Sequence, residues 1–167
     1  GTAIGATYSG TSAAPTNGLI VEGNVGIGTT APAKKLDVAG AINSAIGYHI
    51  AGSTVLAFNV VNNIFVGVNA GTATAQGGGH SNTFVGNAAG ESNFSGYGNS
   101  FLGYYAGNAN TEGTGNVFLC QNAGRSNILG SNNVFIGPSA GYNNKAGMNV
   151  FIGYGAGNAN TDGADNT

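Results

Sequence analysis

Charge is the scarcest property of this sequence. Its 167 residues include four basic and six acidic side chains, whereas about a quarter of a typical soluble domain is charged. With a formal net charge of −2 and so few cations, the chain has no basic surface to neutralise phosphates, which excludes nucleic-acid binding. The same scarcity excludes disorder driven by charge repulsion.

Cysteine and long apolar runs are also scarce. The one cysteine, Cys120, excludes an intrachain disulfide framework and a cysteine zinc site. No apolar run approaches the roughly 18–20 residues of a membrane span, and no charged-then-apolar leader opens the chain. We therefore expect no membrane insertion.

Glycine, at 32 positions, and asparagine are instead abundant, and they recur with a period. The tripeptide Phe-(Val/Leu/Ile)-Gly occurs five times, and a sixth copy has Cys120 in the place of glycine. The phenylalanines of the six copies are Phe65, Phe84, Phe101, Phe118, Phe135 and Phe151. Their spacing identifies a repeat of about 17 residues, with a slightly longer first interval and a slightly shorter last one.

Other positions of the repeat are equally regular when each Phe is numbered position zero. Alanine stands at position five, and glycine stands at positions six and twelve, in all six copies. Asparagine stands two places before each Phe, at Asn63, Asn82, Asn99, Asn116, Asn133 and Asn149. Six copies in register predict one structural unit per repeat.

Each unit carries one segment that favours a β-strand, Asn-x-Phe-x-Gly. Helix-pair repeats need about 33 residues or more, and aromatic and β-branched residues favour strands. We therefore predict an all-β fold, a parallel β-helix or β-roll solenoid of about six coils stacked roughly 4.8 Å apart. A weaker extended piece around the Ala-Gly pair would form the return side, glycines would occupy the corners, and no helix is expected.

Stacking places each side chain over its counterpart in the next coil. The six phenylalanines would then form a buried column of rings, the core of the repeat. The six asparagines would either form a ladder of hydrogen bonds along the axis or serve as corner residues, because asparagine tolerates left-handed turn geometry. Both interpretations of the asparagines fit the sequence.

Both faces of the predicted strand are apolar. The position after each Phe is always aliphatic, and the position before it includes Ile64, Val117, Val134 and Val150. Side chains alternate between the two faces of a strand, and the interior of a single coil covers only one of these faces. We expect the other face to meet another chain, most simply in a homotrimer around a fibre axis; a double-layered monomer is the alternative.

Residues 1–62 do not follow the period. Residues 1–17 are small and polar and predict a linker or an extended strand, and residues 18–62 predict a β-rich leader or connector before the repeat domain, 63–167. Within the leader we expect short strands before and after Glu22-Gly23, a turn at residues 29–33 and a strand at 34–38. Residues 55–61 are expected to enter the first coil. The chain begins without methionine and stops inside a repeat, so we expect it to be a segment of something longer.

Two stretches resemble known proteins. Residues 23–40, Gly-Asn-Val-Gly-Ile-Gly-Thr-Thr-Ala-Pro-Ala-Lys-Lys-Leu-Asp-Val-Ala-Gly, resemble a segment of phage tail-fibre-like and related surface proteins, which often lies upstream of a self-cleaving chaperone domain. The Asn-x-Phe-x-Gly-x-x-Ala-Gly units resemble repeats of the same fibre proteins. They are also distantly similar to the head repeats of trimeric autotransporter adhesins, which form left-handed β-rolls packed as trimers, although those coils are shorter and lack Phe. No chaperone domain is present in the sequence, so autoproteolysis is assigned to no residue.

The sequence offers little for catalysis or cofactors. The glycines of residues 23–28 lack the dinucleotide spacing, and no Gly-Lys-Ser/Thr phosphate loop is present. Paired carboxylates would make a glycosidase, but Glu112 and Asp162, which share repeat position eleven, would lie three coils apart, roughly 14 Å by strand spacing, beyond the ~5–9.5 Å of hydrolytic pairs. Glu91 is one coil from Glu112 but at a different position. We expect no enzyme and no cofactor.

The sequence gives little support for metal ligands or a catalytic thiol among the remaining polar residues. His49 and His80 have no second ligand at metal spacing, and Asp162 and Asp165 lack the oxygen count of a calcium loop. Cys120 has no base nearby and is interpreted as a tolerated small residue. Candidate glycan contacts, with exposed or interchain packing as the alternative, are Tyr104, Tyr105, Tyr142 and Tyr154.

These patterns favour a structural and adhesive protein over an enzyme. We expect a fibre segment, extracellular or on a virion, whose coils stack and trimerise and which attaches to a cell surface through glycans. One alternative is a subunit of a polymerised extracellular filament, and another is a polysaccharide-degrading tailspike.

Overall fold

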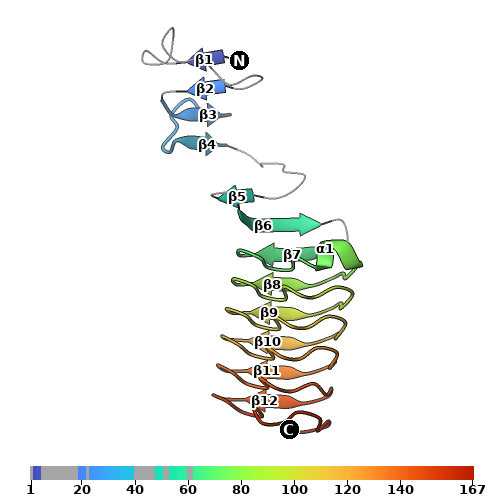
Figure 1. Ribbon diagram of the computed structural model, residues 1–167. Helices are drawn as coiled ribbons and strands as arrows, with labels where there is room; N and C mark the ends of the chain where they lie inside the picture. The colour runs from blue at the N-terminus through green and yellow to red at the C-terminus, as the bar shows by residue number, and fades with distance from the viewer. Residues whose placement is uncertain (1, 5–18, 22, 40–47, 51–52, 60–61) are drawn as a thin grey trace. The chain divides into compact units, whose positions relative to one another are not determined.

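The computed structural model describes residues 2–4, 19–21, 23–39, 48–50, 53–59 and 62–167. The chain divides into two compact units, Gly1–Ser44 and Ala45–Thr167. The second unit contains all six repeats, and an eight-stranded sheet runs through it (Figure 1).

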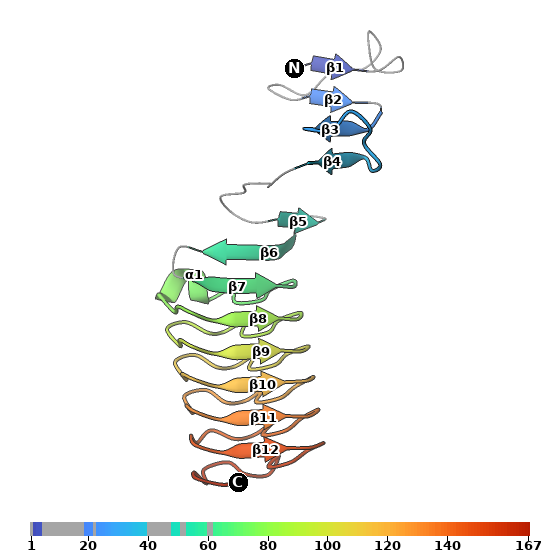
Figure 2. The ribbon, with the colours of Figure 1, turned by 180° about the vertical axis from the view of Figure 1, so that it is seen from behind.

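The six repeats form a parallel β-solenoid, which confirms the predicted fold class. One strand in each repeat contributes to a common sheet: β7 (Asn63–Val66), β8 (Thr83–Val85), β9 (Ser100–Leu102), β10 (Val117–Leu119), β11 (Val134–Ile136) and β12 (Val150–Ile152). Each strand pairs with the next in parallel, and every Phe lies opposite the Phe of the neighbouring coil. Seen from behind, the same strands stack as parallel rungs (Figure 2).

The return side of each coil consists of turns, so the expected second extended piece is wrong. Turn conformation follows each strand, through the Ala-Gly pair. The glycine at position six adopts a left-handed φ of 57–63° in every copy. A Cβ atom on Gly124 would collide with the ring of Phe118, so the chain bends over the ring at a residue that has no side chain.

The start of the solenoid is antiparallel. Strands β5 (Tyr48–Ile50) and β6 (Ser53–Asn59) pair antiparallel with each other, and β6 pairs antiparallel with β7. Because β6 is antiparallel to the strand of the first repeat, the expectation that residues 55–61 enter the first coil is wrong for the described part of that segment. Residues 60–61 lie outside the described residues. The sequence does not distinguish the two directions, because either one presents the same apolar residues.

A single helical turn, α1 (Thr74–Gly77), interrupts the first coil and was not predicted. This coil spans the longest interval between successive phenylalanines, Phe65 to Phe84, and α1 lies within it. Within the described ranges, no helix combines the length and the apolar character needed to cross a bilayer.

The first unit contains two short parallel pairs. Strand β1 (Thr2–Ile4) pairs with β2 (Leu19–Val21), and β3 (Val25–Ile27) pairs with β4 (Leu36–Val38). The linker prediction for residues 1–17 falls mostly outside the described residues, as does Glu22. The side-chain amide of Asn24, just before β3, donates at 3.0 Å to the carbonyl of Pro32 in the predicted turn between β3 and β4.

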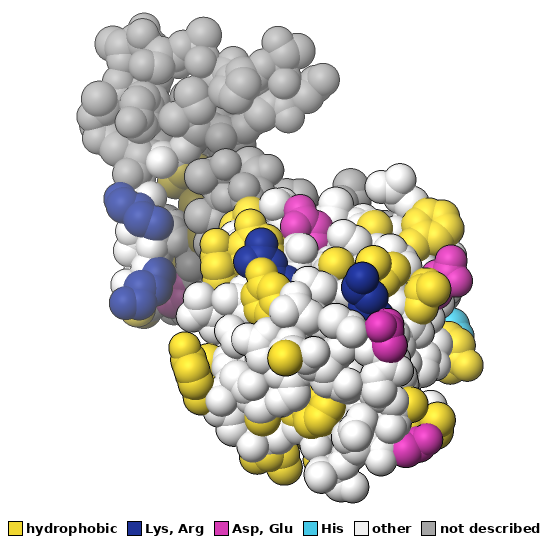
Figure 3. Space-filling view, turned by 60° about the horizontal axis from the view of Figure 1, so that its bottom comes forward, with side chains coloured by type: hydrophobic (Ala, Val, Ile, Leu, Met, Phe, Trp, Pro, Cys, Tyr) yellow, Lys and Arg dark blue, Asp and Glu magenta, His cyan; other side chains and the backbone are white. Residues whose placement is uncertain are grey.

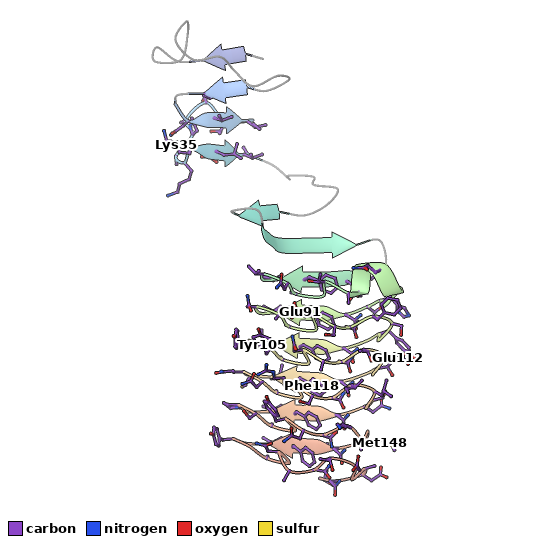
Figure 4. The ribbon with its side chains drawn as sticks, viewed as in Figure 1. Lys35, Glu91, Tyr105, Glu112, Phe118 and Met148 are labelled. Atoms are coloured by element: carbon purple, nitrogen blue, oxygen red, sulfur yellow. The ribbon has the colours of Figure 1, made fainter. Side chains whose placement is uncertain are left out.

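The core of the solenoid is the column of phenylalanine rings. Successive rings stack with centroids 4.7–5.3 Å apart and interplanar angles of 4–16°. Five of the six alanines at position five pack against them, and Phe118 lies inside the coil in Figure 4. Each coil therefore has a core one ring thick.

Cys120 occupies a backbone position that suits glycine. Its φ is 96°, and the glycines at the same repeat position have φ of 124–142°. A side chain with such a φ is strained by about 1–3 kcal/mol.

We expect Cys120→Gly to raise the free energy of unfolding by about 1 kcal/mol, after the greater entropy of glycine in the unfolded chain is subtracted. Urea denaturation measures the difference; Cys120→Ala, which keeps the Cβ atom, should show no such gain, and an equal gain in both variants would contradict this explanation.

Candidate functional site

The asparagines at position minus two are buried and bonded along the axis. In each successive pair, the backbone N–H of one asparagine donates to the side-chain Oδ1 of the asparagine in the preceding coil, at 2.7–2.9 Å. The Nδ2 atom of Asn116 donates to the Gly130 carbonyl at 2.8 Å. None of the six has a positive φ; the left-handed corner lies one residue earlier, as at Asn62 and Asn132. This column joins adjacent coils.

A second asparagine column, at position nine, was missed by the sequence interpretation. Its members, all nearly or fully buried except the last, are Asn93, Asn110, Asn127, Asn144 and Asn160, with Thr74 in the first coil. The Nδ2 atom of Asn110 donates to Oδ1 of Asn93 at 2.8 Å, and that of Asn127 donates to Oδ1 of Asn110 at 3.2 Å. The signal was present in the sequence, since asparagine stands at this position in five of the six copies.

The second column is interrupted at Asn144. Its Nδ2 and Oδ1 atoms are buried and make no hydrogen bond in the described protein. Other members donate to the carbonyl three residues ahead, as Asn127 does to Gly130 at 2.8 Å. The coil that contains Asn144 is one residue shorter than the coil before it, and Ala146 takes the place of Gly130 by accepting a bond from Asn133. The carbonyl three residues ahead of Asn144, that of Gly147, accepts from the side chain of Asn149 instead.

The outward face of the sheet is apolar, and no part of the chain that the structure describes covers it. Side chains on both sides of each Phe point away from the core and are half-buried or exposed. Leu102 is 51% exposed and Ile152 67% exposed. Serine and threonine replace the aliphatic residue only before Phe84 and Phe101. The sheet thus presents an aliphatic stripe along the solenoid.

Three of the four candidate tyrosines lie in one aromatic cluster. The rings of Tyr104 and Tyr105 meet edge to face, with centroids 4.4 Å apart. The guanidinium carbon of Arg125 lies 4.6 Å from the centroid of Tyr105 and 5.8 Å from that of Tyr142. Tyr154, 87% exposed, makes no ring contact in the described part of the chain. Arg125 was not predicted, although it stands one repeat before Tyr142 at position seven and so stacks beside it.

Tyr104 remains protonated at neutral pH. Partial desolvation, and then the neighbouring Tyr105 phenol, raise the pKa of Tyr104 above its usual value, while Arg125 acts in the opposite direction. The Tyr104 residue is half exposed, and a protonated phenol can both donate and accept a hydrogen bond.

The carboxylates and histidines are dispersed. Glu91 accepts a hydrogen bond from the side-chain amide of Asn108 at 3.0 Å. Glu112 lies at the edge of the coil opposite Tyr105 in Figure 4. The ring of His80 stacks on Tyr97 with centroids 4.9 Å apart, whereas the side chain of His49 lies outside the description. Within the described ranges, no three His, Cys, Asp or Glu residues come together as a metal site; the carboxylate of Asp162 accepts a bond from Thr161.

No family model, no curated protein and no solved structure matches the chain. The functional interpretation therefore rests on the geometry of its own residues and on the resemblances in its sequence.

Proposed function

We propose that this chain is a non-enzymatic structural segment of a surface fibre, extracellular or on a virion, that assembles as a homotrimer and attaches to a cell surface. The observation that carries the proposal is the aliphatic stripe on the outer face of the sheet. The resemblance of residues 23–40 and of the repeats to fibre and adhesin proteins supports it.

The aliphatic stripe favours an oligomer. Parallel sheets occur almost only with both faces covered, and a contiguous exposed apolar surface marks an interaction site. Here one face is covered by the phenylalanine column, and no described residue of the chain covers the other. Because the stripe runs through all six rungs, a parallel copy can match it rung for rung. Three copies around one axis would bury all three stripes at once.

The solenoid also suits rigid extension. Each coil is joined to the next by strand pairing, by the two asparagine columns and by backbone bonds between turns, such as that from Gly124 to the Ala140 carbonyl at 2.9 Å. The strand pairing and the first asparagine column repeat at every coil, so a bend would break several of these bonds together. The low charge adds little repulsion along such a rod.

The mass of the full chain in solution tests the proposed assembly. We expect a complex of three chains of 16.3 kDa each at micromolar concentration, measured by sedimentation equilibrium. Leu102→Asp places a charge in the middle of the stripe. It should raise the dissociation constant of the trimer at least tenfold, because the carboxylate would be buried without a partner.

Leu129→Asp is the matched control. Leu129 is 59% exposed, about as much as Leu102, but it lies outside the strands, so this variant should remain a trimer. A monomeric wild-type chain, or equal dissociation of both variants, would contradict the proposal. An open-ended polymer would instead support the filament alternative.

A further inference from the structure

A groove lies among the turns on the return side of the solenoid. Its volume is about 370 Å³, and its lining comes from four successive coils: Ala109, Ser126, Ile128, Asn143, Lys145 and Thr161. Lys145 belongs to the coil that is one residue short. The groove therefore lies where the regular stacking of turns is interrupted.

Arg125 immediately precedes Ser126, one of the residues that line the groove. Its contacts with Tyr105 and Tyr142 are through the ring faces. Stacking of this kind leaves the N–H groups at the edge of the guanidinium available, and those groups match a carboxylate in a bidentate manner. In the described part of the chain no carboxylate pairs with Arg125. The two rings hold the side chain in place before any ligand arrives, which lowers the entropy lost on binding.

Lys145, the second cation of the solenoid, lines the groove itself. Arg125 and Lys145 are the only arginine and lysine within 62–167, and they belong to adjacent coils, about 4.8 Å apart along the axis. Lys145 is exposed and forms no ion pair with a described residue; the nearby Asp162 accepts a bond from Thr161 instead. Both cationic side chains of the solenoid lie on the one face drawn in Figure 3.

We propose that this groove binds an acidic oligosaccharide, in which one sugar carboxylate pairs with Arg125 and the next acidic residue of the glycan lies at Lys145. This inference rests on the proposed attachment to a cell surface and names its ligand class. Ile128 and Ala109 supply an apolar floor for the C–H face of a sugar ring, while Ser126, Asn143 and Thr161 supply hydroxyl and amide groups for its hydroxyls. An acidic peptide would use the two cations but would leave these hydroxyl and amide groups without sugar partners.

Binding of a hexamer of galacturonic acid to the full chain tests the inference, with the fully methyl-esterified hexamer as the neutral comparison. We expect the acidic hexamer to bind at least tenfold more tightly than the ester in isothermal titration calorimetry. Its affinity should fall with added salt, because both contacts are ionic. Arg125→Gln and Lys145→Gln should each weaken binding about tenfold. Arg125→Lys should also weaken it, since lysine keeps the charge and loses the planar fork.

Lys34→Gln is the matched control, because it removes one exposed cation outside the solenoid and should leave the affinity unchanged. Equal binding of the ester, equal loss in Lys34→Gln, or no binding of the acidic hexamer would overturn the inference. Equal binding of a glutamate hexamer would also overturn it, by showing that charge alone is recognised.

The test of glycan binding can fail independently of the test of trimer assembly. Arg125 and Lys145 lie outside the strands, so Arg125→Gln should leave the sedimentation mass unchanged. A trimer that binds no acidic glycan would refute the groove assignment alone, and a monomer that binds it would refute the assembly alone.

Discussion

Replacing Phe118 by alanine is expected to lower the free energy of unfolding by about 3–5 kcal/mol. The ring is fully buried in the middle of the column and stacks on Phe101 and Phe135 with centroids 4.8 Å away on both sides. The coil is one ring thick, so no other side chain can fill the cavity. The loss should appear as a lower urea midpoint with a similar slope.

Tyr154→Ala is the control for this substitution. Tyr154 belongs to the same solenoid and is 87% exposed, so removal of its ring should change the unfolding free energy by less than about 0.5 kcal/mol. Phe118→Ala would contradict the structure if it cost no more than Tyr154→Ala, because the phenylalanine column would then not be the core.

Asn116→Ala is expected to destabilise the solenoid by about 2–4 kcal/mol, because it leaves a buried donor unpaired. The Oδ1 atom of Asn116 accepts from the backbone N–H of Asn133 at 2.9 Å and from its side-chain amide at 3.1 Å. The Nδ2 atom donates to the Gly130 carbonyl at 2.8 Å. All of these groups lie between two coils, where water does not replace the lost partner. Thermal or urea unfolding measures the change.

Asn144→Ala provides the matched comparison, because Asn144 is equally buried but its side chain bonds no described protein group. Its removal should change the unfolding free energy by less than about 1 kcal/mol, since the buried amide is already unpaired. If the two substitutions cost the same, the hydrogen bonds of the asparagine column would not be what stabilises the coils.

The repeat made most of the solenoid predictable. Phe at position zero and Gly at position six recur together because the ring of one occupies the space that a Cβ atom of the other would need, as at Phe118 and Gly124. The same identity of position from coil to coil predicts in-register parallel pairing. The second asparagine column carried a signal in five of the six copies, and its spacing alone would have placed it between the coils.

Other features depend on contacts that no local pattern encodes. The strand β6 shows apolar residues typical of a rung, yet its antiparallel direction is set by the chain path before it. The Arg125 cluster required knowledge of which side of the turn each position faces, since Tyr105 and Arg125 occupy different repeat positions. The groove is lined in part by Lys145 of the coil that is one residue shorter, and only the packed turns show where it lies.

The sequence by itself determined the period, the parallel stacking and the identity of the buried ring, because a side chain that repeats in every coil must lie above its own copy. Only the tertiary structure decided the antiparallel start, the direction of the turn side chains and the position of the groove. These depend on how one coil meets the next in space, and a period along the chain does not specify that contact.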